Sequence, residues 1–202
     1  LIRREFSPKR PTKSKRPATQ TFARGSVDET SEPWDSWDKR KSVTVRVPAT
    51  SANLGSGFDT IGIALDMWSE ITVERADEFS MTCEGEGAEH LQSLNEKNLV
   101  CVGVKTAFEY VGEELPPLKY TCRNRIPFGK GLGSSSAAIV GGLIAGLALC
   151  GKELKVFGED SLYSGGVTAE PEELLQLACK IEGHPDNVAP AIYGGIQLGI
   201  KM

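Results

Sequence analysis

The stretch from Ile126 to Ala138 constrains this chain more than any other. It reads Ile-Pro-Phe-Gly-Lys-Gly-Leu-Gly-Ser-Ser-Ser-Ala-Ala, with three glycines at alternate positions followed by three serines. Glycine permits a backbone with positive φ and lets a ligand approach closely, because it has no Cβ. Serine favours the N-cap of a helix, and the uncharged run up to Cys150 predicts that helix. Free N–H groups and the helix dipole attract anions at such a loop, so we predict a phosphate site.

Other interpretations of this stretch fit its residues less well. A Walker-type loop requires Gly-Lys followed by Ser or Thr, and Lys130 lies between two glycines instead. A dinucleotide fingerprint requires G-x-G-x-x-G, whereas these glycines run G-x-G-x-G after a strand with charged alternate residues. The uncharged segment 132–151 is long enough to cross a membrane, but its glycines and serines favour a buried helix. A plain turn explains one or two glycines, not three before three serines.

The charge distribution argues against nucleic acid as a partner. The net charge is −4, yet residues 1–25 hold eight Lys/Arg and one acid, so they carry +7 and the remaining residues carry −11. Nucleic-acid affinity rests on Lys and Arg meeting phosphates, and an acidic body is poor at this. The five cysteines lack a C-x-x-C spacing, which predicts buried reduced thiols and no zinc cluster. They are Cys83, Cys101, Cys122, Cys150 and Cys179.

Periodicity predicts an ordered domain after a polar N-terminal segment. Residues 1–42 have no apolar period and are expected to be a disordered tail, or an organelle transit segment because the first 25 are basic and acid-poor. Residues 43–202 are expected to form one domain. Strands are predicted at 43–47, 61–65, 70–74, 79–84, 118–126 and from 194, and helices at 98–110, 134–149, 170–181 and 188–193. Pro48 is expected to end the first strand, with loops at 49–59 and 152–168.

Three segments together resemble one family of enzymes. Residues 126–137 look like the phosphate-binding signature of the GHMP small-molecule kinases, which include galactokinases, homoserine kinases and mevalonate kinases. Residues 47–62 are similar to the N-terminal substrate motif of the homoserine kinase branch, and residues 182–190 to its H-x-D-N motif. The resemblance covers residues 43–202. It implies an α+β fold: the GHMP kinase N-terminal domain, a ribosomal-protein-like mixed sheet with helices on one face, with the C-terminal domain largely absent.

The resemblance implies a nucleotide site built on the glycine loop. ATP is the expected cofactor, and its phosphates would lie against backbone N–H groups. The residues implied in binding it are Pro127, Gly129, Lys130, Gly131, Leu132, Gly133, Ser134, Ser135, Ser136 and Ala137. Magnesium prefers few protein oxygens together with phosphates and water. Ser135, with Ser134 as the alternative, and Glu182 are its expected ligands, and Glu173 is a weaker substitute for Glu182.

The resemblance also implies the substrate, L-homoserine, whose hydroxyl would be phosphorylated in threonine biosynthesis. Its expected contacts are Asn53, Asp59, His184, Asp186 and Asn187. Asp59 and Asp186 suit the ammonium group, since an ionised carboxylate only accepts hydrogen bonds. Asn187 would orient the hydroxyl, and Asp186 is the alternative general base. In the family, arginines beyond residue 202 hold the substrate carboxylate and a third glycine-rich motif completes the nucleotide site.

Several questions stay open at the level of the sequence. A chain that ended at Met202 is expected to bind nucleotide weakly and to phosphorylate little. The alternative functions are another GHMP kinase, of the mevalonate or sugar type, and a catalytically incomplete nucleotide-binding fragment. A small-molecule substrate is expected, with no membrane partner, and a homodimer is left open. The expected location is the cytoplasm, or an organelle if residues 1–25 are a transit segment.

Overall fold

A long antiparallel ribbon organises the computed structural model, which describes residues 40–154, 168–169 and 171–199. β1 (Ser42–Leu54) pairs with β2 (Gly57–Arg75) along most of its length. The alternating valines of β1 bury one face, with Val45 and Val47 almost fully inaccessible, as a half-buried strand requires. The predicted tail or transit segment lies outside the described residues, and so does most of segment 152–168.

The first predicted loop is wrong, because residues 49–54 and 57–59 are β-structure. β1 continues through Pro48 to Leu54, and the two predicted strands at 61–65 and 70–74 are parts of the single strand β2. The register shifts between Pro48 and Ala49. Such an irregularity accommodates a proline, which lacks a ladder N–H. The small polar residues beyond it pair because β2 offers them a partner, which local composition does not reveal.

The main sheet is mixed and follows the order β1-β2-β4-β3. β4 (Leu118–Asn124) is antiparallel to β2 and parallel to β3 (Ser80–Gly85). The short β7 (Ile196–Leu198) pairs with the first part of β2. β4 alternates between buried and more exposed residues, so one of its faces meets water, as its charged alternate residues require.

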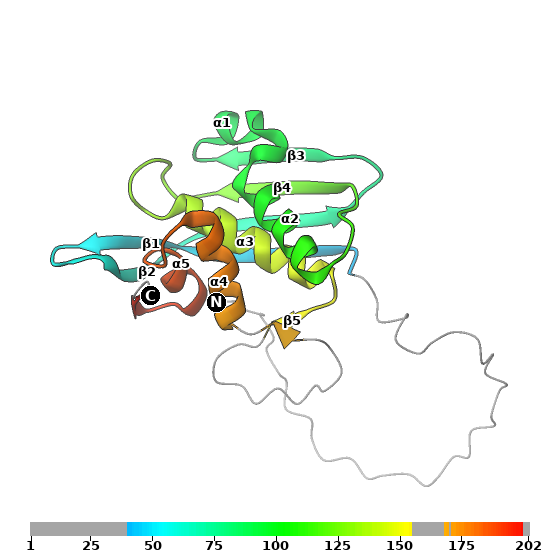
Figure 1. The fold of residues 1–202 in the computed structure, drawn as a ribbon. Coiled ribbons are helices and arrows are strands. Elements are labelled where there is room, and N and C mark those ends of the chain that lie inside the picture. The colour runs from blue at the N-terminus through cyan, green and yellow to red at the C-terminus, as the bar shows by residue number, and fades with distance from the viewer. Residues whose placement is uncertain (1–39, 155–167, 170, 200–202) are drawn as a thin grey trace, which may run out of the picture. The chain divides into compact units, whose positions relative to one another are not determined.

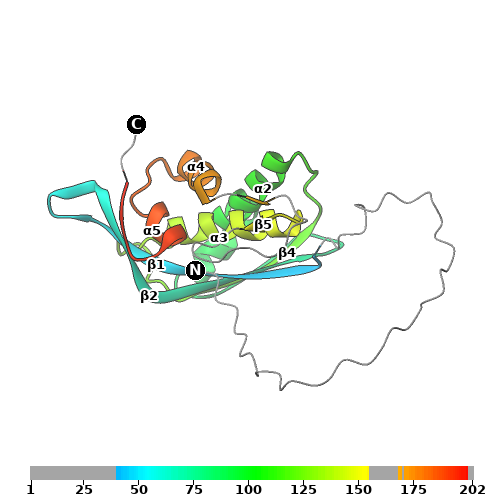
Figure 2. The same ribbon diagram turned by 90° about the horizontal axis from the view of Figure 1, so that it is seen from below.

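Helices α2 to α5 cover one face of this sheet (Figures 1 and 2). Their bounds are α2 (Leu99–Val111), α3 (Ser134–Leu149), α4 (Pro171–Glu182) and α5 (Val188–Tyr193). These four helices confirm the predicted ones to within a residue at each end. The structure adds α1 (Ala88–Ser93), the 3₁₀ turn η1 (Asn95–Lys97), and a parallel pair of two-residue strands, β5 (Glu153–Leu154) and β6 (Thr168–Ala169).

Helix α3 is the centre of the core. It packs on β1 and β2 below and against α2 and α4 at its sides, and residues 136, 137 and 139–149 are all buried. Fully burying a Val, Leu or Ile side chain contributes about 1.5–3 kcal/mol to folding. The apolar composition of α3 is therefore that of a core helix. Among the described residues, no helix combines the length and apolar character needed to cross a membrane.

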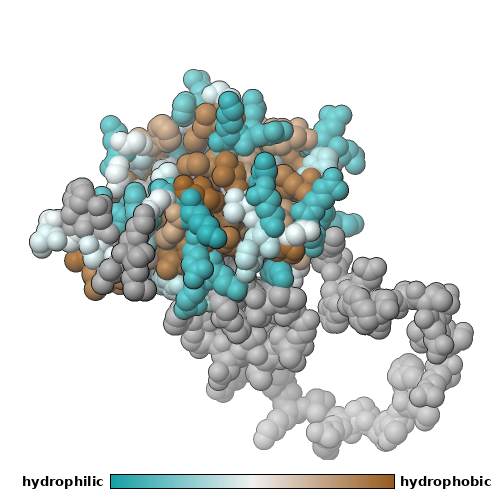
Figure 3. Space-filling view, in the orientation of Figure 1, coloured by the Kyte–Doolittle hydropathy of each residue, from teal (hydrophilic) through white to brown (hydrophobic). Residues whose placement is uncertain are grey.

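The cysteine prediction is confirmed for the thiols that line this core. Cys83, Cys101 and Cys122 are buried, whereas Cys150 and Cys179 are partly buried, and all five are free thiols. Over the helical face, Figure 3 shows hydrophobic residues lying among hydrophilic ones.

Candidate functional site

The glycine loop presents a turn of left-handed residues at the start of α3. Gly129, Gly131 and Gly133 have φ values of 70°, 70° and 65°, a region that strongly favours glycine. Gly133 is the N-cap of α3, and no side chain caps the helix. The expectation of a serine N-cap is therefore wrong: Ser134 is the first helical residue. Without a capping side chain, the first N–H groups of α3 keep their capacity to bind an anion.

Asn124 fixes the point at which the chain enters this loop. Its Oδ1 accepts hydrogen bonds from Ser69 Oγ (2.7 Å) and from the Ile126 N–H (3.1 Å). Its Nδ2 donates to the Glu86 carbonyl (2.9 Å). One buried amide therefore joins β2, the end of β3 and the first residue of the loop.

Thr50 joins the glycine loop to the H-x-D-N turn. It is fully buried, its N–H donates to the Leu132 carbonyl (3.1 Å), and its Oγ1 donates to Asn187 Oδ1 (2.9 Å). A Cβ on Gly133 would lie 1.9 Å from Thr50 Oγ1, so only glycine fits beside this side chain. The structure thus brings all three sequence motifs together at one residue.

Glu182 meets the first turn of α3. Its Oε1 accepts hydrogen bonds from Ser135 Oγ (2.7 Å) and Ser136 Oγ (2.8 Å). Glu173 lies nine residues earlier on α4, about 13 Å away along a helix with a rise of 1.5 Å per residue. Glu182, not Glu173, is therefore the carboxylate at this corner of the site.

The H-x-D-N turn holds a buried carboxylate. Asp186 is 1% exposed; its Oδ1 contacts His184 Nδ1 and accepts from the Asn187 N–H (2.9 Å). Its Oδ2 is buried and has no hydrogen-bond partner among the described residues. The turn packs on β2 so closely that a Cβ on Gly62 would lie 1.8 Å from the Asp186 carbonyl oxygen.

The hairpin tip supplies the remaining substrate candidates, and it is more open. Asn53 is exposed, has a φ of 61°, and sits where the pairing register shifts between Ala52 and Leu54. Asp59 belongs to β2, but its side chain lies outside what the structure describes.

The side chains of the loop itself differ in exposure. Lys130 is exposed, as are Gly129 and Gly131, whereas Pro127 and Leu132 are half-buried. Lys130, one of the residues implied in nucleotide binding, therefore faces solvent.

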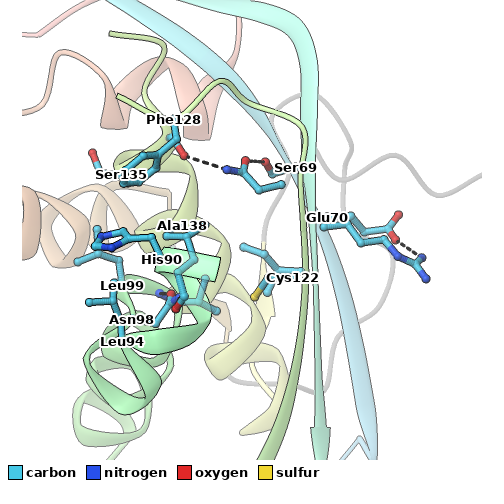
Figure 4. A pocket seen from close by; sticks show the side chains of 16 residues that line it. Ser69, Glu70, His90, Leu94, Asn98, Leu99, Cys122, Phe128, Ser135 and Ala138 are labelled. Atoms are coloured by element: carbon cyan, nitrogen blue, oxygen red, sulfur yellow. Dashed lines mark hydrogen bonds and ion pairs between the residues drawn. The ribbon is translucent and has the colours of Figure 1, made fainter. Parts of the chain in front are cut away.

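An apolar cavity of about 300 Å³ lies beside the first turn of α3 (Figure 4). The ring of Phe128 stands 5.4 Å from that of His90, centroid to centroid. In Figure 4 Glu70 points away from the cavity, toward Arg123 on the outer face of the sheet. The lining residues are Ser69, Glu70, Ile71, His90, Leu91, Leu94, Asn98, Leu99, Val100, Cys122, Arg123, Asn124, Phe128, Ser134, Ser135 and Ala138.

The fold and the site together identify the class of domain to which this chain belongs. Residues 98–195 match the family described as the GHMP kinases N terminal domain, and the mixed sheet with its helices on one face is the fold of that domain. The chain therefore carries a GHMP kinase N-terminal domain, and the expected α+β fold is confirmed.

Within that class the similarity points to homoserine kinases. The chain is 42% identical over 158 residues to the homoserine kinase of Desulfitobacterium hafniense, a match that covers 78% of this chain and 48% of that protein. It is 30% identical to the crystal structure of the Cytophaga hutchinsonii homoserine kinase, with a TM-score of 0.61, covering 79% of this chain and 48% of the other. The mevalonate kinase of Methanococcus jannaschii shares the fold at 19% identity and a TM-score of 0.56, over 79% of this chain and 56% of the other. The chain spans about half the length of the curated relatives it matches.

Sequence reasoning missed Thr50, Asn124 and the cavity. Thr50 and Asn124 act through hydrogen bonds to distant segments, and no local spacing reveals such partners. The sequence offered one signal for the role of Asn124: it is a polar residue near the end of a strand, just before the glycine loop. The cavity is assembled from five separate segments, so no single stretch carries its pattern.

Proposed function

We propose that the glycine loop and the first turn of α3 bind the phosphates of ATP. The support is the uncapped helix start after three left-handed glycines, since backbone N–H groups and the helix dipole favour anions there. The cavity beside Ser134 and Ser135 is apolar and lies next to this loop, which suits the base and sugar of the same nucleotide. Phe128 and His90 at its edge offer rings on which a base can stack.

We further propose that the protein containing this domain phosphorylates the hydroxyl of L-homoserine. The observation that carries this proposal is Thr50, which bonds the phosphate loop through its N–H and Asn187 through its hydroxyl. A γ-phosphate at the loop and a hydroxyl near Asn187 would then lie at adjacent positions. Catalysis of phosphoryl transfer is mostly such positioning together with charge neutralisation. The similarity to homoserine kinases supports the choice of substrate.

In this proposal Asp186 accepts a hydrogen bond from a polar group of the substrate. Its buried Oδ2 has unused acceptor capacity within the described part of the chain, and a buried polar atom of this kind calls for a partner. An ammonium group is one such partner, and the hydroxyl proton released on transfer is another. The hydroxyl oxygen forms a bond to the γ-phosphorus while the bond to the bridging oxygen of ADP breaks. Asn53, Asp59 and His184 are proposed to complete substrate binding, and Asn187 to orient the hydroxyl.

Ser135 and Glu182 fit a magnesium site. Their oxygens meet at hydrogen-bond distance, and hard oxygen ligands beside phosphates are what magnesium prefers. Bound there, the ion would neutralise negative charge that develops on the phosphates. The chain's own contribution is to hold the Glu182 carboxylate at the helix start through two serine hydroxyls.

Two measurements test the proposal. Isothermal titration with a non-hydrolysable ATP analogue, with and without magnesium, should give saturable binding that Gly133→Ala weakens. A turnover assay that compares homoserine, mevalonate and galactose should favour homoserine. Turnover with mevalonate or galactose in preference would support another GHMP kinase, and nucleotide binding without turnover would support a non-catalytic role.

The place of action and the assembly state are proposals of the same kind. We propose a cytoplasmic enzyme, or an organellar one if residues 1–25 act as a transit segment. A fusion of residues 1–42 to a fluorescent protein distinguishes the two by its location. A homodimer is tested by light scattering of the purified protein.

A further inference from the structure

Two thiols lie side by side on neighbouring strands, and one of them lines the cavity. Cys83 on β3 and Cys122 on β4 are directly paired in the parallel register. Both are buried, with 8% and 6% of their surface exposed. Neighbouring strands lie about 4.8 Å apart, and a disulfide spans Cα atoms separated by about 4.4–6.8 Å. The backbone thus already holds the two cysteines at a separation that a disulfide can bridge.

The thiols also contact each other. A side-chain hydrogen bond between the two thiols lowers the pKa of Cys83 and raises the pKa of Cys122. The thiolate is the reactive form in thiol chemistry. Of the two thiols, Cys83 is therefore the one that ionises more readily.

The cavity gives this pair a route to solvent. Cys122 lines the cavity together with Phe128, Ser134 and Ser135 (Figure 4). A small oxidant that enters the cavity meets Cys122, the member of the pair that lines it, without unfolding of the sheet. A ligand in the cavity would cover the same thiol.

We propose that Cys83 and Cys122 form an oxidisable dithiol that hydroperoxides convert into a disulfide at the edge of the nucleotide cavity. The Cys83 thiolate attacks one peroxide oxygen, the O–O bond breaks, and Cys83 becomes a sulfenic acid as one water or alcohol leaves. The Cys122 sulfur then displaces the sulfenic oxygen, which takes up the released proton and leaves as water. The peroxide is reduced by two electrons, and the two thiols are oxidised by the same two.

Cys101 provides the matched control. It is equally buried at 5% exposure and lies on α2, where Cys83 and Tyr120 both act on its pKa. Burial raises the pKa of Cys101 to about 12, so it has almost no thiolate at neutral pH. The partly buried Cys150 and Cys179 are replaced by serine in every protein tested, which removes their own oxidation from the readout.

The experiment treats the folded Cys150→Ser/Cys179→Ser protein with hydrogen peroxide, alkylates free thiols under denaturing conditions, and maps tryptic peptides by mass spectrometry. The expected product is a Cys83–Cys122 linked peptide, reversed by dithiothreitol. It should persist in Cys101→Ala and disappear in Cys83→Ser and in Cys122→Ser. Full alkylation of both cysteines after peroxide treatment, or a link from Cys101 instead, would overturn the proposal.

A second, separate measurement tests whether a ligand in the cavity protects the two thiols from oxidation. Adenosine at saturating concentration should slow formation of the link by on the order of tenfold, as expected for a site reachable only from the unliganded state. An unchanged rate while titration shows that adenosine binds would refute this coupling. If titration shows no binding of adenosine or an ATP analogue, the proposed nucleotide function fails, and peptide mapping still decides whether the dithiol exists.

Discussion

The glycine loop and the tip of the β1–β2 hairpin flank the same site, yet they are held in different ways. The loop is tied at its entry by Asn124, in its middle by Thr50, and at the helix start by Glu182. The tip is held mainly by pairing between its own two strands, and Asn53 on it is exposed. Contacts with β4, β1 and α4 therefore hold the loop. The tip depends more on strand pairing, so changes there should act on a smaller part of the site.

The largest effect is expected at Gly133. In Gly133→Ala the new Cβ would meet Thr50 Oγ1, and affinity for an ATP analogue should fall by on the order of a hundredfold, since hydrogen bonds to a charged group are worth about 1.5–3 kcal/mol each.

Gly131→Ala is the control, because its φ is similar but no atom lies within 4 Å of the added Cβ. Both substitutions cost about 1–2 kcal/mol of backbone strain, and overpacking at Gly133 adds about 1–3 kcal/mol. If urea denaturation showed the same loss of unfolding free energy in Gly133→Ala and Gly131→Ala, the close contact between Gly133 and Thr50 would be contradicted.

Glu182→Gln should have the next largest effect. The amide keeps the size of the side chain but loses the charge, so magnesium-dependent affinity for the ATP analogue should fall on the order of tenfold, or about 1.4 kcal/mol. Affinity without magnesium should change little. Glu172→Gln, an exposed acid at the other end of α4, is the matched control. A similar loss with and without magnesium would show that Glu182 acts only by supporting the helix start.

Thr50→Val tests the link between the two motifs. The change keeps the shape but removes the hydroxyl that donates to Asn187, and it should lower the free energy of unfolding by about 1 kcal/mol. The backbone bond to Leu132 remains, so nucleotide affinity should change by less than about threefold. Thr50→Ser should restore stability. If the serine variant were as unstable as the valine variant, the lost methyl packing rather than the hydrogen bond would be responsible.

The smallest effect on nucleotide is expected at the hairpin tip. Asn53→Ala should change affinity for the ATP analogue by less than about twofold, or about 0.4 kcal/mol, because the loop contacts described above come from Asn124, Thr50 and Glu182. The Michaelis constant for homoserine should rise by more than that. An equal loss of nucleotide affinity and homoserine use would remove the distinction between loop and tip.

The sequence was sufficient for features that depend on neighbouring residues. The glycine loop, α2, α3, α4 and α5 follow from local periodicity and from glycine chemistry, and the structure confirms them. The hairpin was missed because Pro48 and the small residues after it are poor strand formers by themselves. Their conformation comes from pairing with β2, which no local pattern encodes.

The same distinction applies to the candidate site. Ser135 and Glu182 were placed together from the family motif, and the structure brings their oxygens into contact. Thr50 was passed over because its partners lie at Leu132 and Asn187, in segments far along the chain. Hydrogen bonds of this kind are visible only once the sheet and the helices are assembled.

The Thr50–Asn187 hydrogen bond also bears on when the site appears during folding. It spans 137 residues of sequence, and contacts of such long separation form slowly because a large loop must close first. A chain that had formed only its local helices would lack the junction of the three motifs. Nucleotide binding should then select the fully folded state and stabilise it in proportion to the logarithm of ligand concentration. Recovery of ligand affinity during refolding would therefore lag behind recovery of helical circular dichroism.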